Sequence, residues 1–169
     1  MKKYFFIAAL LITAAFSLTS CGDDEPKEKT TVTATYTLTF SQDMLDATSI
    51  VIYYKADNGR NAFEPITDKW WTKTVTSDKF PAEFGVMYRF SPKTVAELEK
   101  EKYDLTFDMN FSYKTSKGAS STNSVSIIDA KGVSKDKVES TLKNFNGKST
   151  GFKVTIDGFV SPANNLKYD

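Results

Sequence analysis

The sequence has 169 residues, with 22 basic and 21 acidic side chains, one cysteine and no histidine. Without histidine the chain lacks the side chain best suited to acid–base chemistry at neutral pH, so catalytic triads and transition-metal sites are disfavoured. Arg60 and Arg89 are the two arginines, and the lysines are scattered, which disfavours nucleic-acid binding. This composition predicts one domain without metal or cofactor, and not an enzyme.

The first twenty residues have the pattern of a secretory signal peptide. Lys2 and Lys3 form a short positive segment, and residues 4–16 form an apolar run interrupted by Thr13. A helix of this length covers about 20 Å, whereas a membrane-spanning helix needs about 30 Å. The pattern therefore predicts a cleaved signal peptide over residues 1–20 rather than a transmembrane helix.

The signal peptide ends in Leu18-Thr19-Ser20-Cys21, which resembles the lipobox of bacterial lipoproteins. The resemblance implies cleavage before Cys21, lipidation of its thiol, and attachment of the mature chain to a membrane through acyl chains. Cys21 is the single cysteine, so a lipidated chain has no thiol left for a disulfide. The alternative is a soluble secreted protein whose cysteine lies near a cleavage site.

The segment 21–30 has no side chain large and apolar enough to enter a core, so it is predicted to be a flexible tether. Asp23, Asp24 and Glu25 follow the cysteine after one glycine. This acidic run resembles the surface-export signal of Bacteroidota lipoproteins. The resemblance implies an outer-membrane lipoprotein displayed on the cell surface; the alternative is a hydrated spacer.

Residues 31–160 alternate between apolar and polar side chains as β-strands do. The clearest strand is 103–114, in which six large apolar residues share one face, and the next is 31–40, in which every second residue is threonine. Further strands are predicted at 49–55, 70–76, 84–90, 124–129 and 152–156. Residues 41–48 and 116–123 are polar and predicted to be turns or loops, and Asp57-Asn58-Gly59 is a strong turn signal.

Two short helices complete the prediction. Ser91-Pro92 begins one helix of two to three turns to about Lys102, with a capping box from Thr94 to Glu97. The second spans 134–145, where apolar residues recur at helical spacing. The last segment, 161–169, is predicted to be a loose tail.

About seven strands at short spacing, with few helices, predict a mainly β fold. We expect an antiparallel immunoglobulin-like β-sandwich as a single domain over residues 31–160. A lipocalin-like barrel is the alternative. The sequence of this domain does not resemble a known family.

Trp70 and Trp71 are adjacent, so in a strand they point to opposite faces. Trp71 is in register with Val75 and is predicted to point inward, whereas Trp70 is in register with three threonines and is predicted to point outward. Exposed aromatic rings can stack on sugar rings or bind a protein partner. Trp70, Trp71 and Tyr53, the last on the second apolar face of its strand, are therefore the candidate ligand-binding residues. The alternative is that the helix over 134–145, or a loop, covers the outer tryptophan.

These features predict a lipid-anchored, cell-surface protein that acts as a non-catalytic binding or adhesion module for a glycan or a protein. The alternative is a structural subunit of a pilin-like or outer-membrane assembly, in which the strand at 31–40 could be a donor strand. A carboxylate-dependent hydrolase is the third hypothesis. Asp104 and Asp108 share one strand face but lie about 13 Å apart, too far for a glycosidase pair.

Overall fold

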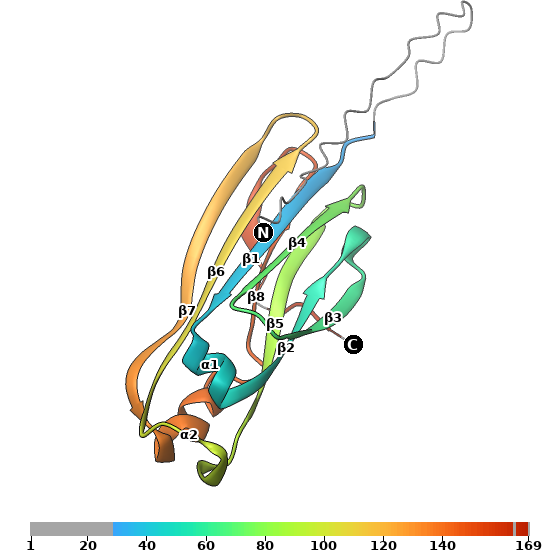
Figure 1. Ribbon diagram of the computed structural model, residues 1–169. Helices are drawn as coiled ribbons and strands as arrows, with labels where there is room; N and C mark the ends of the chain where they lie inside the picture. The colour runs from blue at the N-terminus through green and yellow to red at the C-terminus, as the bar shows by residue number, and fades with distance from the viewer. Residues whose placement is uncertain (1–28, 164, 169) are drawn as a thin grey trace, which may run out of the picture.

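The computed structural model describes residues 29–163 and 165–168, which form two antiparallel β-sheets packed face to face (Figure 1). Sheet A has four strands in the order β4-β1-β6-β7, and sheet B has five in the order β3-β2-β5-β8-β9. The described strands thus form two separate sheets and no closed barrel, so the predicted sandwich is confirmed and the barrel alternative is wrong. The strands are β1 (Val32–Phe40), β2 (Thr48–Lys55), β3 (Asn61–Ile66), β4 (Trp70–Ser77), β5 (Ala82–Pro92), β6 (Lys102–Thr115), β7 (Ser120–Ser134), β8 (Ser149–Val154) and β9 (Val160–Pro162).

The two ends of the sandwich differ. The helices α1 (Gln42–Ala47) and α2 (Val138–Lys143) gather at one end, and β1 begins at the other (Figure 1). We call the second end the entry end. It also contains the β6–β7 turn, because Ser116 N donates to Thr31 O at 2.8 Å and Thr31 N donates to Ser116 Oγ at 3.1 Å.

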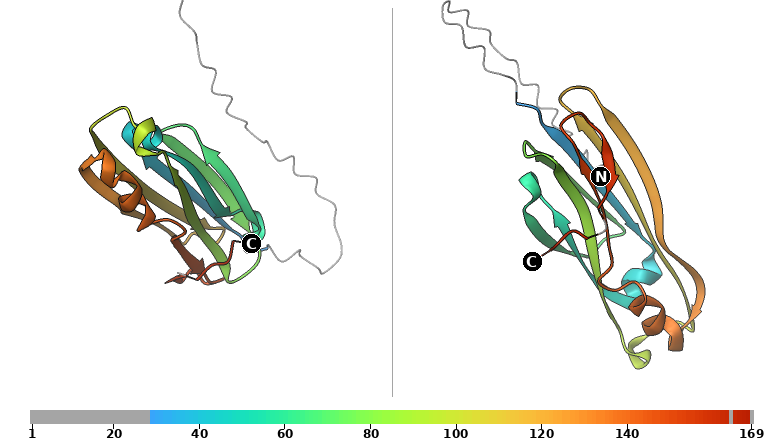
Figure 2. Two further views of the ribbon diagram at one scale, coloured as in Figure 1. Left: turned by 90° about the horizontal axis from the view of Figure 1, so that it is seen from below. Right: turned by 180° about the vertical axis from the view of Figure 1, so that it is seen from behind.

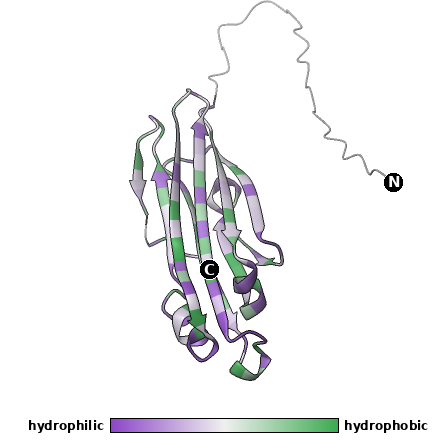
Figure 3. Cartoon of the chain, turned by 60° about the vertical axis from the view of Figure 1, so that its left-hand side comes forward, coloured by the Kyte–Doolittle hydropathy of each residue, from purple (hydrophilic) through white to green (hydrophobic). Residues whose placement is uncertain are grey.

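The core lies between the sheets and is rich in aromatic rings. Along β1 each apolar residue is buried and each threonine is half-buried, and β6 buries its six apolar residues in the same way. Figure 3 shows this alternation of hydrophobic and hydrophilic residues along the strands. Phe107 is fully buried and stacks on Phe40 with ring centroids 4.6 Å apart, whereas Asp108 is exposed. The period-two pattern therefore identified the core faces of both strands correctly.

Two strands were not predicted and a third is longer than expected. β3 contains Pro65 and has one buried side chain, Ile66, so its apolar pattern is too weak to read as a strand. Proline is tolerated there because β3 is the edge of sheet B. β9 has three residues, and β7 extends over fifteen, including several that the sequence placed in a loop.

The sequence missed one helix and overestimated another, whose predicted start, Ser91-Pro92, is the end of β5. Residues 41–48, expected to be a turn, contain α1; Ser41 Oγ caps it by accepting from Met44 N at 3.1 Å, and Met44 and Ala47 are buried. The helix expected up to about Lys102 is a single 3-10 turn, Val95–Glu97. Its capping box forms, but all three residues of the turn are exposed. Leu98 is the one buried residue between 91 and 102, so a longer helix would have had almost no apolar face to bury.

The second predicted helix is also shorter. It begins as a 3-10 turn at Lys135–Lys137 and continues as α2. α2 buries Val138 and Leu142, two of the apolar residues whose spacing predicted it.

The expectation of a loose C-terminal tail is corrected by the contacts of its described residues. Ala163 N donates to Gly151 O at 2.8 Å, and Lys167 O accepts from Lys55 Nζ at 2.7 Å. Between these points Leu166 lies against Gly151, where an added Cβ would be 2.6 Å from the leucine Cδ1. The segment thus crosses the outer face of sheet B from β9 toward β2, as Figure 2 shows from behind. The sequence missed this because the segment has almost no apolar periodicity.

Candidate functional site

Trp71 belongs to the core, as its register with Val75 predicted. Its ring packs against Tyr36 and Tyr54, with centroids 6.4 and 5.2 Å away. Its Nε1 donates to Glu64 Oε2 at 2.8 Å. Both the ring and the N–H group of the indole therefore have partners within the protein, and Trp71 has a packing role.

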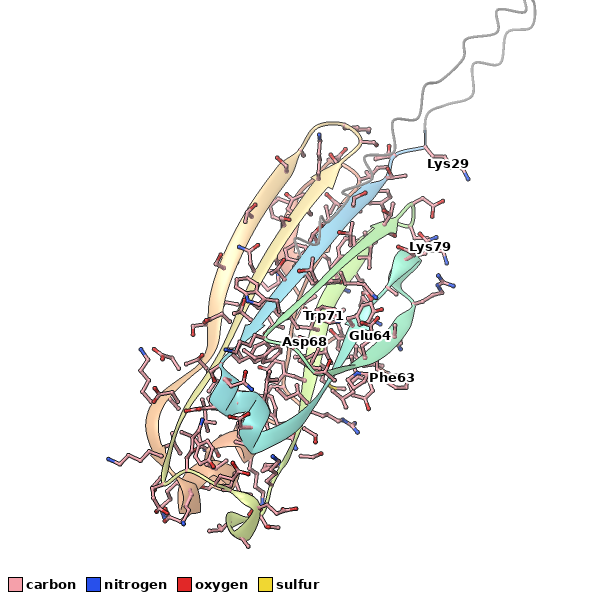
Figure 4. All side chains as sticks on the ribbon, viewed as in Figure 1. Lys29, Phe63, Glu64, Asp68, Trp71 and Lys79 are labelled. Atoms are coloured by element: carbon pink, nitrogen blue, oxygen red, sulfur yellow. The ribbon has the colours of Figure 1, made fainter. Side chains whose placement is uncertain are left out.

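Glu64 joins the two sheets along one side of the sandwich. It lies on β3, the edge of sheet B, and accepts from Trp71 and pairs with Lys73 Nζ at 2.5 Å, both on β4, the edge of sheet A. Tyr54 OH donates at 2.9 Å to Oε1, the oxygen that also pairs with Lys73. Burial acts to raise the pKa of Glu64, but the bonds from Lys73, Trp71 and Tyr54 outweigh it and hold the pKa below its usual value. Figure 4 shows Glu64 and Trp71 side by side at this edge.

Trp70 points away from the core and is 69% exposed, as its register with the threonines predicted. α2 and the loops leave it open to solvent, so the covered-tryptophan alternative is wrong. The ring lines a shallow depression of about 370 Å³ at the junction of α1 with the β3–β4 turn. The other lining residues are Gln42, Leu45, Thr67, Asp68 and Lys69.

Tyr53 lies on a different surface, the outer face of sheet B. Its ring centroid is 5.6 Å from that of Phe63 on β3, and the Arg89 guanidinium lies 5.2 Å from it. Trp70 lies at the edge of sheet A and Trp71 lies in the core. The structure therefore does not bring Tyr53, Trp70 and Trp71 into one site.

A groove lies on the opposite side of the sandwich, between the edge strands β7 and β9. Its volume is about 370 Å³, within the range of small-ligand sites. Phe111 on β6 and Phe152 on β8 form an aromatic floor, and Val160 and Pro162 form the β9 wall. The β7 wall consists of Ser121, Thr122 and Asn123. None of the lining residues is charged.

The β7 wall contradicts the usual pattern of a sandwich. Ser121 pairs with Tyr113 and Asn123 with Phe111, so both lie on the face of β7 that is turned toward sheet B. They are nevertheless exposed, because the opposing strand β9 is too short to cover them. Polar residues at core-facing positions that remain open to solvent mark a candidate ligand site.

The sequence did not identify this groove. Residues 116–123 were expected to be a loop, since a run of serine, threonine and asparagine has no apolar alternation. The neighbouring strand does carry a hint of β7. The apolar face of β6 continues through Phe111 and Tyr113, which indicates that a further strand pairs with β6 along these residues.

A third hollow, about 470 Å³, lies beneath the C-terminal segment. Its charged residues have partners within the protein. Lys55 Nζ donates to Asn61 Oδ1 and to Lys167 O, both at 2.7 Å, and Lys153 Nζ pairs with Glu83 at 2.7 Å. Because three of its four charged side chains, Lys55, Lys153 and Glu83, are already bonded within the protein, this hollow is a weaker candidate than the uncharged groove.

Three observations limit the chemistry available to the described residues. They contain no group of three or more histidine, cysteine, aspartate or glutamate side chains placed to hold a metal ion. No helix in the described ranges has the length and apolar character needed to cross a bilayer. The predicted lipidation residue Cys21 and the acidic residues Asp23, Asp24 and Glu25 lie outside the described residues.

Comparison of the chain with protein-family models, with characterised proteins and with solved structures gave no match. The arguments about function therefore rest on the residues and geometry of this chain.

Proposed function

We propose that this protein is a lipid-anchored outer-membrane lipoprotein on the cell surface and acts as a non-catalytic binding or adhesion module. The anchor is Cys21, and the export signal is the acidic run of Asp23, Asp24 and Glu25. The ligand is a glycan or a segment of a partner protein, and the β7–β9 groove is its binding site.

One observation carries the binding hypothesis: exposed polar residues occupy the core-facing side of β7 above an aromatic floor. An ordinary strand would place apolar residues at Ser121 and Asn123 to close the sandwich. Hydroxyl and amide groups beside aromatic rings suit a neutral ligand that offers both hydrogen-bonding groups and apolar faces, as a sugar does. The uncharged lining supports the same class, because an ionic ligand would find no opposite charge there.

The test is to measure binding of the purified full chain to glycan and protein arrays, and then to fill the groove. Asn123→Trp places a large ring over the floor and should abolish binding, with little effect on the fold because Asn123 is exposed. The matched control is Ser126→Trp, on the same strand but paired with Asp108 on the outer face of sheet A. Equal binding by both variants would rule out the groove as the site.

The assembly-subunit alternative has one supporting observation. β7 is an exposed edge strand of fifteen residues, and such an edge can pair with a strand of another chain. The pairing of β1 with β4 on one side and with β6 on the other does not support a donor-strand role for residues 31–40, because this strand fills a place in its own sheet. Purified protein that forms fibres or ladders of oligomers would favour this alternative.

A further inference from the structure

The turn between β8 and β9 carries two large apolar side chains at its tip. Phe159 is 69% exposed and Ile156 is 46% exposed. Turns are usually built from polar residues and glycine, so this pair is unusual for its position. Neither residue belongs to the hydrophobic core cluster.

The turn is held in one conformation. Thr155 N donates to Phe159 O, and Gly158 N donates to Thr155 O, both at 2.9 Å. Gly158 has φ +83°, a conformation that favours glycine. Tyr113 OH also donates to Gly158 O at 3.2 Å. The two apolar side chains are therefore presented outward on a fixed support.

The turn lies at the entry end of the sandwich. A Cβ added to Gly158 would lie 2.6 Å from the Ala119 Cβ, which places the turn against the β6–β7 turn. The β6–β7 turn in turn bonds to Thr31, where the chain enters β1. Seven residues lie between the predicted anchor Cys21 and Lys29, so the entry end can lie no more than about 30 Å from the lipid surface.

The charged residues around this end also suit a lipid surface. Lys29, Lys79 and Lys117 are exposed there, and Figure 4 shows the first two at the same end. Long lysine side chains can keep their charge among headgroups while apolar neighbours enter the membrane interface.

We propose that Ile156 and Phe159 insert into the lipid interface and give the anchored domain a second contact with the membrane. This inference rests on the proposed lipid anchor. The tether keeps the turn at a high effective concentration near the bilayer, so a weak contact of two side chains suffices. The contact orients the domain with its entry end toward the lipid and with α1 and Trp70 facing away.

The experiment uses the lipidated full chain in phosphatidylcholine vesicles whose acyl chains are brominated, because bromine quenches tryptophan at the interface. In a Trp70→Phe background we compare Phe159→Trp with Phe63→Trp. Phe63 is the matched control, since it is 67% exposed but lies on β3 away from the entry end. Trp71 remains in both variants, so the emission of the Trp70→Phe parent is subtracted. Relative to unbrominated lipid, the tryptophan at 159 should then lose roughly half or more of its emission and the one at 63 almost none.

No quenching at position 159, or equal quenching at both positions, would overturn the membrane contact. Flotation of the wild-type chain with the vesicles tests the anchor separately. A chain that floats but shows no quenching refutes the contact alone. A chain that does not float refutes the lipid anchor and, with it, this contact.

Discussion

At the residue scale, the chain separates two neighbouring tryptophans by a single step along β4. Trp71 faces the core and bonds to Glu64, whereas Trp70 faces solvent at the edge of sheet A. Their opposite environments follow from the two-residue period of a strand. Of these two adjacent residues, Trp71 packs against the core and Trp70 lies on the surface.

The tryptophans should therefore respond differently to truncation. Trp71→Ala removes packing against Tyr36 and Tyr54 and leaves the Glu64 carboxylate without one donor, so we expect a loss of roughly 2–4 kcal/mol in the free energy of unfolding. Trp70→Ala should change it by less than about 0.5 kcal/mol. Urea denaturation of both variants measures this difference. Similar losses at the two positions would show that Trp70 also has a structural role.

Trp70→Ala also tests whether its depression contributes to ligand binding. A ligand that binds only in the β7–β9 groove should bind this variant as it binds the wild type, because the depression lies at the other edge of sheet A.

At the scale of elements, the two sides of the sandwich at which edge strands of the two sheets meet differ in how they are closed. On the β3–β4 side, Glu64 accepts from three side chains and ties the sheets together. On the β7–β9 side one bond among the described residues joins the two sheets, from Tyr113 OH to Gly158 O at 3.2 Å, and the groove beside it stays open. The first side protects the edges of the sheets, and the second leaves an aromatic surface accessible.

The bonds that Glu64 accepts from Trp71, Lys73 and Tyr54 predict a contribution to stability that is lost in acid. Because the pKa of Glu64 is lower in the folded chain than its ordinary value of 4.5, the contribution is complete above pH 4.5 and is lost as the pH falls through the folded value. Glu64→Gln should lower the urea midpoint at pH 7, and the difference from wild type should shrink near pH 3.

Glu139→Gln on α2 is the control, since its side chain is exposed and the charge change is the same. It should leave the midpoint at pH 7 almost unchanged. A constant difference between wild type and Glu64→Gln at both pH values would contradict the role given to the carboxylate.

At the scale of the whole molecule, the entry end connects the folded domain to its predicted anchor. β1, where the chain enters, is one of the two inner strands of sheet A and pairs with both β4 and β6. Any force on the tether is therefore transmitted to a strand that is bonded on both sides. The helices and Trp70 lie toward the opposite end and so face away from the predicted anchor.

The anchor itself predicts how the protein fractionates. Each buried methylene of an acyl chain contributes about 0.8 kcal/mol, so two or more chains on Cys21 should hold the protein stably on membranes. Cys21→Ala should move it to the soluble fraction or leave an unprocessed precursor of higher mass. Alanine at Asp23, Asp24 and Glu25 is the paired variant: it should keep the membrane attachment but lose cleavage by external protease in intact cells. Wild type and Cys21→Ala with equal mass and equal fractionation would refute the lipoprotein hypothesis.

The sequence by itself determined the fold class and the core faces of the strongest strands. Alternation in β1 and β6 is a local property, because burial of one face of a strand requires an apolar residue at every second position. It placed Phe107 inside, Asp108 outside, and the two tryptophans on their correct sides. The lipobox resemblance also needs only adjacent residues.

The tertiary structure alone decided which edges meet and what covers them. The bond from Trp71 to Glu64 depends on β3 and β4 lying at the same side of two different sheets, and no local pattern encodes that. The groove exists because β9 is too short to cover Asn123, which is a relation between segments far apart in the chain. The C-terminal segment is ordered by the space above Gly85 and Gly151, where the absence of side chains lets Leu166 approach the sheet. Contacts of this kind join residues far apart in the sequence. No local pattern of apolar and polar residues predicts them, so only the folded structure shows them.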